Sequence, residues 1–337
     1  MKTISRRTIL GTGAALPLVA LHSGPAGAAQ TFRYRLATNL ATTHPLNTTL
    51  TTAIAKIKER SNGQVQITLF PNSVLGPDTD MLSQIRTGAV QFFTLSGLIL
   101  STLVPEAALS GVGYAFKDYD QVWSAMDGKV GGYIRSKIAT HGLIAFDKIF
   151  DNGFREITTS THPIDTPADL KGLKIRVPYA ALWTSLFKSF GSVPTSINFA
   201  EVYSALQTHL VAAQENPLAI IETSKLYQVQ KYCSMTNHMW DGFWFLANPA
   251  AFRKLSPKLQ GIVQEEINAA AVAERTEVLK LNDSLQTKLA QQHMVFNKTD
   301  PQQFRDVLIK AGFYTQWHKH FGDQAWSLLE GAVGKLG

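Results

Sequence analysis

The sequence contains one cysteine, Cys233, among 337 residues. A single cysteine excludes a disulfide framework, a CxxC metal or redox pair, and a lipid-accepting cysteine after a leader sequence. Stability must therefore come from a hydrophobic core, and 45% hydrophobic residues is ordinary for a globular protein. The chain is about twice the roughly 150 residues of a typical domain, so two lobes and one large domain are both open.

The familiar motifs of enzyme active sites are also missing. The chain has no G-x-S-x-G, no H-E-x-x-H and no G-x-x-x-x-G-K-[ST]. Residues 111–116, "GVGYAF", form only half of a dinucleotide fingerprint, and we interpret them as a turn. His318 and His320 stand two residues apart with no carboxylate at ligand spacing. The sequence therefore predicts neither a metal site nor a cofactor.

Neither sign of charge dominates, and 17% of the residues are charged. The formal net charge of +7 falls to +4 when Lys2, Arg6 and Arg7 of the N-terminal leader are removed. An excess so small and so scattered argues against nucleic acid as a partner.

The first thirty residues have the layout of a secretory signal peptide. Basic "MKTISRRTIL" leads into the apolar run "ILGTGAALPLVAL" and then into the small residues "GPAGAA". Residues 5–10 fit the twin-arginine export pattern, and the A-x-A site at 26–28 would leave a mature chain that starts near Ala29. We predict a signal peptide over 1–28 and a periplasmic location. An uncleaved N-terminal anchor is the alternative.

A second apolar stretch, residues 87–105, carries no charge over a length close to a membrane span. Gln91, Gly97 and five hydroxyl residues dilute it. We interpret it as a buried strand and the start of a helix rather than as a transmembrane helix.

Strand and helix patterns alternate along the mature chain. Val65, Ile67 and Leu69 alternate with polar residues after a segment of helical spacing, which together with "FRYRLAT" predicts a βαβ unit. The pattern repeats over 166–190, and a long helix, or two in sequence, is predicted from 256 to about 294. No linker or repeat marks a boundary, so a two-lobe division would require crossings of the chain. The predicted fold class is α/β.

The polar residues that remain suit the binding of an anion. Arg176 lies near the carboxyl end of a predicted strand, where ligands of open α/β sheets bind, and its guanidinium could clasp a carboxylate through two hydrogen bonds. A surface arginine is the alternative, and Arg155 has the same ambiguity. Asn216 precedes Pro217 and is expected to cap the next helix, whereas Glu215 would need a partner if it is buried.

Four segments, in this order, carry a resemblance to a known family. They read "SNGQVQITLFPNSVLGPDTDMLSQIRTGAVQF", "DNGFREITTSTHPIDTPADLKGLKIRVP", "SVPTSINFAEVYSALQTHLVAAQENPLAII" and "KYCSMTNHMW". The mature chain resembles the extracytoplasmic solute-binding proteins of tripartite ATP-independent periplasmic (TRAP) transporters, which include dicarboxylate- and sialic-acid-binding members. The likeness covers essentially the whole mature chain.

The resemblance implies a carboxylate site and its residues. Arg176, in "KIRVP", matches the arginine that forms the main salt bridge to the substrate carboxylate in that family. Arg155 in "NGFRE" and Asn216 in "QENP" match supporting carboxylate contacts. Phe199 matches the pocket aromatic residue, and Asn39 matches a pocket-lining position on the other lobe.

The resemblance also implies a two-lobed periplasmic-binding-protein fold with crossing hinge strands and a long helix that spans both lobes. Lobe I would comprise 30–153 plus 242–281, and lobe II 154–241 plus 282–337. Closure of the lobes over a small organic acid would create the form that the permease subunits in the membrane recognise.

The nature of the acid is a separate question. Members that bind sugar acids add polar or acidic side chains after the segment "GAVQFFT", whereas this chain continues "LSGLIL". Tyr179 and Trp183 follow Arg176, and Trp240 lies at an expected lobe crossing, so aromatic walls suit an apolar or aromatic body. We predict a monocarboxylate, such as a 2-oxo or 2-hydroxy acid with an aromatic or branched substituent. An exported hydrolase or lyase that acts on a carboxylate, or an envelope protein without a small ligand, are the alternatives.

Overall fold

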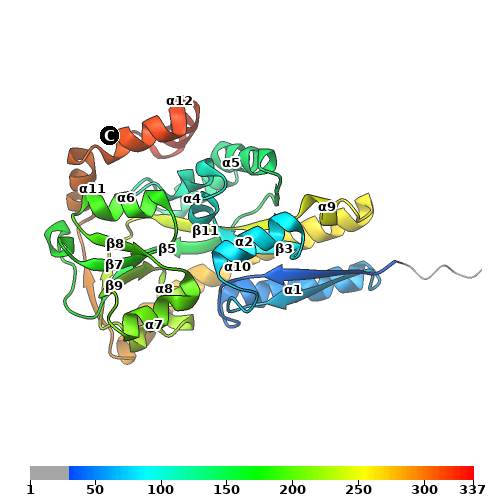
Figure 1. The fold of residues 1–337 in the computed structure, drawn as a ribbon, viewed down its shortest axis with the longest axis horizontal. Helices are drawn as coiled ribbons and strands as arrows, with labels where there is room; N and C mark the ends of the chain where they lie inside the picture. Colours follow the sequence, from blue (N-terminus) through cyan, green and yellow to red (C-terminus); the bar gives the residue numbers. More distant parts are fainter. Residues whose placement is uncertain (1–29) are drawn as a thin grey trace, which may run out of the picture. The chain divides into compact units, whose positions relative to one another are not determined.

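The computed structural model describes residues 30–337, without the side chain of Asp283. The signal peptide predicted over 1–28 lies outside the described residues. Residues 31–337 are built on two mixed sheets of six strands each, with helices packed around them (Figure 1).

The first sheet grows from the βαβ pattern at the start of the mature chain. Strand β1 runs parallel to both β2 and β3, whereas β11 returns antiparallel to β3, β4 and β5. Its order is β2 (Val65–Phe70), β1 (Phe32–Ala37), β3 (Phe92–Ser96), β11 (Trp240–Ala247) and β4 (Ile144–Ala145), with β5 (Phe150–Phe154) also paired to β11.

The second sheet is assembled from more distant parts of the chain. Strand β7 runs parallel to β8 and β9, so the carboxyl ends of these three strands meet at one edge. Arg176 in β7 and Asn216 at the end of β9 are thereby brought to the same edge. The order is β12 (Val295–Lys298), β10 (Tyr232–Met235), β6 (Glu156–Thr159), β9 (Ala213–Asn216), β7 (Lys174–Val177) and β8 (Val193–Ser196).

The helices begin where the sequence offers caps. Ser256 accepts a hydrogen bond from the amide of Leu259 at 3.4 Å, and Pro257 occupies the first turn of α10. The α-helices are α1 (Pro45–Arg60), α2 (Asp78–Thr87), α3 (Gly97–Leu100), α4 (Tyr119–Met126), α5 (Lys129–Thr140), α6 (Ala181–Ser189), α7 (Val202–Gln207), α8 (Leu218–Thr223), α9 (Pro249–Phe252), α10 (Pro257–Gln291), α11 (Pro301–Lys310) and α12 (Phe313–Val333). Short 3₁₀ helices are η1 (Pro105–Gly111), η2 (Pro167–Leu170), η3 (Phe199–Glu201) and η4 (Leu226–Gln228).

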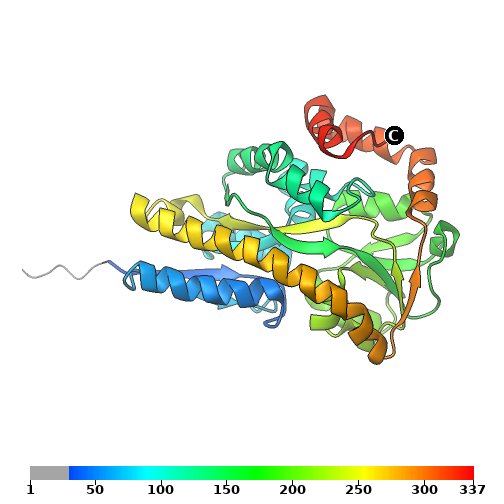
Figure 2. The same cartoon turned by 180° about the vertical axis from the view of Figure 1, so that it is seen from behind.

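The described chain passes between the two sheets at three places. Arg155 alone joins β5 of the first sheet to β6 of the second, and residues 236–239 join β10 back to β11. The third passage is α10, a single helix of 35 residues and about 50 Å, which contacts α1, β5 and α8 in turn (Figure 2). The predicted α/β fold with crossing strands and a long helix is confirmed. The bounds given above for the two lobes stay a prediction.

The middle of the uncharged stretch over 87–105 lies in the core, whereas its two ends are exposed. It forms β3 and α3, and all residues of both elements are buried. Phe92 of β3 packs edge-on against Tyr34 at 5.5 Å and lies 5.3 Å from Phe245. No helix within residues 30–337 is long and apolar enough to cross a membrane.

The C-terminal helix, α12, packs against elements from the first half of the chain. α12 packs against η1, α4 and α5, and also contacts α6.

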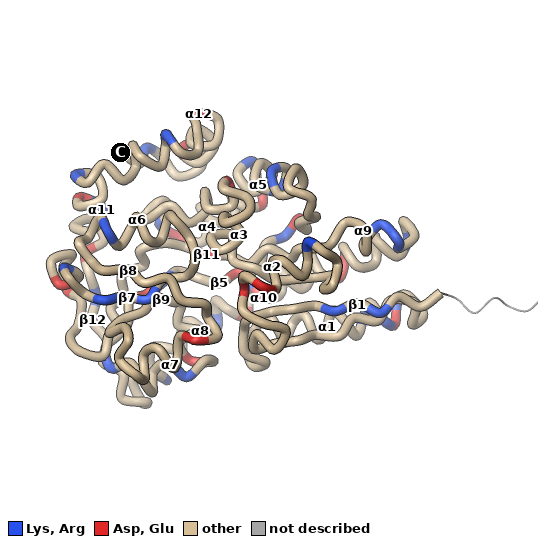
Figure 3. The backbone as a smooth tube through the Cα atoms, viewed as in Figure 1, with Lys and Arg blue, Asp and Glu red and all other residues tan. Residues whose placement is uncertain are grey.

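Basic and acidic residues are interspersed along the described chain rather than gathered in one region (Figure 3). The structure thus offers no extended basic stripe of the kind that binds nucleic acid, as far as residues 30–337 show.

Candidate functional site

Arg155 sits at the passage from β5 to β6 and is 2% exposed. Its Nε and Nη2 donate to the carboxylate of Glu215, its Nη2 also donates to Asn216 Oδ1 at 2.9 Å, and its Nη1 lies 3.3 Å from Asp241. Burial alone would raise the pKa of Glu215, but the charge of Arg155 and a hydrogen bond from His238 lower it. Glu215 therefore has the structural partner that its burial requires.

His238 closes this network on the side of the second crossing. Burial lowers the pKa of His238, so its ring is neutral at pH 7. The ring lies between Thr236 Oγ1, 2.9 Å from Nδ1, and Glu215 Oε2, 3.1 Å from Nε2. A neutral ring that donates from Nε2 and accepts at Nδ1 satisfies both contacts.

Arg176 has a different environment from Arg155. Its Nε and Nη2 donate to the carbonyl of Ile197 at 2.9 and 2.7 Å, while its Nη1 is buried without a hydrogen-bond partner among the described residues. Burial lowers the pKa of Arg176 to about 10, which leaves it charged at neutral pH. The guanidinium lies 5.9 Å from the centre of the Phe199 ring. The Nη1 group of this buried guanidinium can therefore donate hydrogen bonds to a group outside the described residues.

Both arginines line a cavity with about 280 Å³ of space between atoms, its mouth included. This is a small space, below the roughly 300–1,000 Å³ typical of small-molecule sites. The polar lining residues are Asn39, Ser96, Asn152, Arg155, Arg176, Asn216 and Asp241; the apolar ones are Leu40, Ile99, Pro178, Trp183, Phe199, Ile220 and Phe243. The cavity draws these residues from both sheets, so it lies where the two halves of the fold meet.

Two aspartates hold amide side chains at this cavity. Asp241 accepts hydrogen bonds from Ser96 Oγ at 2.7 and 2.9 Å and from Asn152 Nδ2 at 2.9 Å. Asp78, in the first turn of α2, accepts from Asn39 Nδ2 at 3.1 Å. Burial raises the pKa of Asp78 to about 6, although Asn39 and the charge of Arg176 oppose the shift.

Six of the eight predicted site residues line the cavity. They are Arg176, Arg155, Asn216, Phe199, Asn39 and Trp183. The indole nitrogen of Trp183 is buried without a partner in the described part of the chain, and the ring lies 4.8 Å from the Arg155 guanidinium. Trp183 therefore adds a second buried donor to the one on Arg176.

The other two predicted residues lie elsewhere. Tyr179 is 41% exposed and does not line the cavity. Trp240 is buried in the core, where its indole nitrogen donates to Asp151 at 2.8 Å and its ring packs against Trp123 at 5.6 Å. Neither residue lies against the space that the arginines line.

The expectation that Asn216 caps a helix is wrong. Asn216 ends β9, and the residue before α8 is Pro217, whose extended backbone (φ −66°, ψ 156°) occupies the cap position. The Asn216 side chain instead accepts from Arg155 and donates to Gln214 Oε1 at 2.6 Å. The buried guanidinium of Arg155 donates to the amide oxygen of Asn216, which a helix cap would have used to accept a backbone hydrogen bond.

Sequence reasoning missed Asp241, Asn152, Ser96 and Asp78. Asn152 lies three residues before Arg155 in "DNGFRE", and Asp241 directly follows Trp240. An aspartate near the start of an otherwise apolar buried strand was a usable signal, because a buried carboxylate needs donors.

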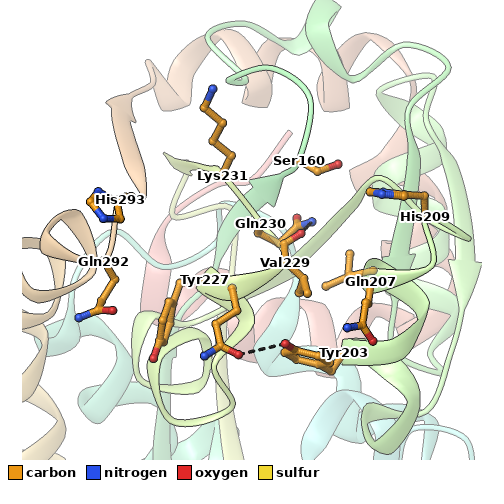
Figure 4. A pocket seen from close by; sticks show the side chains of 12 residues that line it. Ser160, Tyr203, Gln207, His209, Tyr227, Val229, Gln230, Lys231, Gln292 and His293 are labelled. Carbon is orange, nitrogen blue, oxygen red and sulfur yellow. Dashed lines mark hydrogen bonds between the residues drawn. The ribbon is translucent and has the colours of Figure 1, made fainter.

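A larger pocket lies on the outside of the second sheet. It has about 890 Å³ of space, open solvent included, and Figure 4 shows His209 and His293 on opposite sides of it. Tyr203 and Gln228 are paired with each other at 3.0 Å across it, and Lys231 is exposed. Because no buried cation lines this pocket, it is a poorer anion site than the cavity between the sheets.

The residues described here also offer no metal site, since they contain no group of three or more His, Cys, Asp or Glu placed to hold an ion.

Comparisons with known proteins identify the family to which this chain belongs. Residues 36–314 match the family model described as bacterial extracellular solute-binding protein, family 7. The 2,3-diketo-L-gulonate-binding periplasmic protein YiaO of Escherichia coli K12 is 36% identical over 204 residues, which span 60% of this chain and 62% of that protein.

Solved structures extend the likeness to nearly the whole fold. A TRAP periplasmic solute-binding protein from Polaromonas sp. JS666, bound to D-erythronate, has a TM-score of 0.85 at 28% identity and covers 89% of this chain and 98% of its own. One from Ralstonia eutropha H16, bound to (S)-2-acetolactate, has a TM-score of 0.84 at 26% identity, with 89% and 98% covered.

A two-sheet fold crossed by a long helix, with a buried arginine at the wall of a small cavity, is that of a solute-binding protein. The chain belongs to the bacterial extracellular solute-binding protein family 7, the periplasmic binding proteins of TRAP transporters. Members of this family bind solutes and catalyse no reaction, so the hydrolase or lyase alternative is set aside.

Proposed function

We propose that this protein captures a small monocarboxylate in the periplasm and delivers it to the permease subunits of a TRAP transporter. The observation that carries the proposal is Nη1 of Arg176, a buried cationic donor without a partner among the described residues, at the wall of a small cavity. Leaving a buried charged donor unpaired is costly, so a ligand that supplies an anionic acceptor is favoured.

A carboxylate fits the donors that the cavity presents. One carboxylate has two oxygens, and Arg176 Nη1 and Trp183 Nε1 are both free to donate. Asn216 has a second amide hydrogen beyond the one given to Gln214, and Arg155 Nη1 makes only a long contact of 3.3 Å to Asp241. We assign Asn216 and Arg155 supporting roles. Glu215 and Asp241 already neutralise the charge of Arg155, so its main role is to hold this hydrogen-bond network together.

The size and lining of the cavity favour one carboxylate on a compact, partly apolar body. Seven of its fourteen lining residues are apolar, among them Ile99, Phe199 and Phe243. A second carboxylate would meet Asp241, which already holds negative charge against Arg155. The two solved relatives described above are bound to D-erythronate and (S)-2-acetolactate, each a small acid with a single carboxylate.

Closure of two lobes would complete the function. We propose lobe I as 30–153 plus 242–281 and lobe II as 154–241 plus 282–337, with the ligand between them. Asn39 and Ser96 then come from one lobe and Arg176, Phe199 and Asn216 from the other. The carboxylate would lie on residues of lobe II, and the rest of the ligand would contact residues of lobe I that line the cavity. Because the ligand contacts both lobes, it binds the closed form better than the open form and shifts the population toward it.

The test is calorimetric binding of a panel of monocarboxylates, dicarboxylates and sugar acids to protein that has been unfolded and refolded to remove bound ligand. Wild-type protein should bind compact monocarboxylates, and Arg176→Ala should lose about 2–5 kcal/mol of binding free energy because a buried carboxylate loses its partner. Arg176→Lys tests the geometry, since lysine keeps the charge but not the planar donor pair. Unchanged affinity in Arg176→Ala, or binding of none of the acids, would overturn the proposal.

A further inference from the structure

Two of the three asparagines that line the cavity, Asn39 and Asn152, are each held by an aspartate from one side. Asn152 Nδ2 donates to Asp241 at 2.9 Å, and Asn39 Nδ2 donates to Asp78 at 3.1 Å. An ionised carboxylate only accepts hydrogen bonds, so the amide nitrogen must face it and the amide oxygen must face away. In both asparagines Oδ1 is buried and has no partner among residues 30–337.

Asn152 is the more firmly fixed of the two. Its anchor, Asp241, is 1% exposed and receives hydrogen bonds on both oxygens, from Ser96, Asn152 and Arg155. Three donors around one carboxylate leave no position for a reversed amide, which would place Oδ1 against Asp241. Asp78 has an oxygen without a partner in the described chain, so the orientation of Asn39 is less constrained.

The cavity thus presents an acceptor as well as donors. Arg176 Nη1 and Trp183 Nε1 suit a carboxylate, whereas Asn152 Oδ1 needs an O–H or N–H donor, which a hydroxyl group of the ligand or a water molecule can supply. A ketone oxygen in that position would oppose one acceptor with another, and a methylene group would leave the buried acceptor unpaired. Ligands that carry a hydroxyl group, a ketone oxygen or a methylene group at this position therefore differ in binding free energy, even where their shapes are similar.

We propose that Asn152, positioned by Asp241, accepts a hydrogen bond from a hydroxyl group of the ligand, and that the ligand is a short hydroxy carboxylic acid. This inference rests on the proposed function, because it assumes that the carboxylate of the same molecule lies on Arg176. It adds the group that distinguishes a hydroxy acid from the oxo acid of the same carbon skeleton. Asp241 acts through Asn152 and is a positioning residue.

The experiment compares four acids of one skeleton by calorimetry: 2-hydroxybutanoate, 3-hydroxybutanoate, 2-oxobutanoate and butanoate. Wild-type protein should bind one of the hydroxy acids at least about tenfold more tightly than 2-oxobutanoate and butanoate, because a buried acceptor is otherwise unpaired. Asn152→Leu keeps the volume and removes the acceptor. It should abolish this preference while the affinity for butanoate stays the same or rises.

Two further variants separate this role from a general effect on the fold. Asp241→Asn allows either amide orientation at Asn152, so the hydroxy-to-oxo ratio should fall toward one even where the carboxylate still binds. Asn268→Leu is the matched control, because Asn268 lies on α10 and its side chain accepts from the backbone of Lys148 at 3.1 Å. Its preference should equal that of the wild type.

The outcomes distinguish the inference from the function on which it rests. Equal affinity of the wild type for the hydroxy and oxo acids, with binding still dependent on Arg176, would overturn the inference alone. Retention of the full preference in a folded Asn152→Leu protein would do the same. If Asn152→Leu does not fold, the wild-type comparison and Asp241→Asn decide. Failure of every acid in the wider panel to bind would overturn the proposed function, and the inference with it.

Discussion

Arg155 and Arg176 are both buried, yet their surroundings give them different tasks. Arg155 is neutralised by Glu215 and Asp241, whereas the protein acceptor nearest to Arg176 is the uncharged carbonyl of Ile197. No carboxylate in the described residues forms a salt bridge with Arg176. The missing counter-charge is the physical reason to expect an anionic ligand there and not at Arg155.

The first prediction concerns the partner of Arg155. Glu215→Ala should reduce the free energy of unfolding by about 3–5 kcal/mol, because it leaves a buried guanidinium without its main counter-charge. Chemical denaturation, followed by circular dichroism, measures the change.

The surface offers a matched control for that substitution. Glu265 pairs with Arg60 at 2.6 Å, but their side chains are 65% and 42% exposed, so Glu265→Ala should cost no more than about 1 kcal/mol. Equal effects of the two substitutions would show that Glu215 does not neutralise a buried charge.

The site residues on recognisable motifs could be predicted, and those defined by long-range contacts could not. Arg176, Asn216 and Phe199 stand in segments with a family pattern. The roles of Asn152 and Asp241 depend on a hydrogen bond between residues 89 positions apart, which no local spacing reveals. The misplaced cap at Asn216 has the same cause, because its competing partner, Arg155, is distant in sequence.

At the scale of elements, β5 and α10 meet through a pair of buried acids. Glu274 of α10 accepts a hydrogen bond from the backbone amide of Asp151 in β5 at 2.9 Å. Burial raises the pKa of Asp151 to about 7, and burial together with the charge of Asp151 raises the pKa of Glu274. The two carboxyl groups at the contact between the long helix and the crossing strand therefore keep their protons to a higher pH than exposed acids do.

The second prediction follows from the sign of that shift. Because the folded-state pKa of Asp151 is raised, the folded protein binds more protons than the unfolded chain between about pH 4 and pH 7. The free energy of unfolding should fall as the pH rises through this window. Asp151→Asn removes the penalty, so its Tm should exceed that of the wild type by a few degrees at pH 8 and not at pH 4.

Asp127 supplies a control of opposite sign. Burial opposes its ionisation, but the hydrogen bonds and charges of Arg275 and Lys148 outweigh burial and lower the pKa of Asp127. A lowered pKa stabilises the folded state above the unfolded pKa, so Asp127→Asn should reduce Tm at pH 8 and have less effect at pH 3. Scanning calorimetry across this pH range checks both variants. A lower Tm for Asp151→Asn at pH 8 would contradict the account of the acid pair.

The elements themselves were largely predictable where periodicity was strong. The alternation in 65–69 gave β2, and the apolar spacing from Ser256 onward gave α10. Boundaries are harder to predict where a strand is short, because β9, Ala213–Asn216, has too few residues to show a periodic pattern. The position of β9 is fixed by its pairing with β6 and β7. These strands are distant in sequence, so the pairing leaves no local pattern from which it could be predicted.

At the scale of the whole molecule, the sheets are joined by Arg155, by 236–239 and by α10, and the cavity is lined from both. Resemblance predicted this architecture, but composition alone left one large domain and two lobes open. The packing of the C-terminal helix on η1, α4 and α5 could not be predicted from the sequence, because it depends on contacts with residues nearly two hundred positions earlier.

The third prediction is closure on binding. Small-angle scattering of ligand-free protein should give a larger radius of gyration than the complex, because the carboxylate stabilises the closed form. Arg176→Ala should show no such decrease at the same acid concentration. A radius that does not change when wild-type protein is saturated would contradict the closure that we propose.

The most direct test of the central claim is a crystal structure of the wild-type protein with the tightest-binding monocarboxylate. The account predicts a carboxylate oxygen about 2.7–3.0 Å from Nη1 of Arg176, inside the cavity lined by Phe199 and Asn152. An acid bound in the outer pocket of Figure 4, or a carboxylate placed away from Arg176, would contradict it.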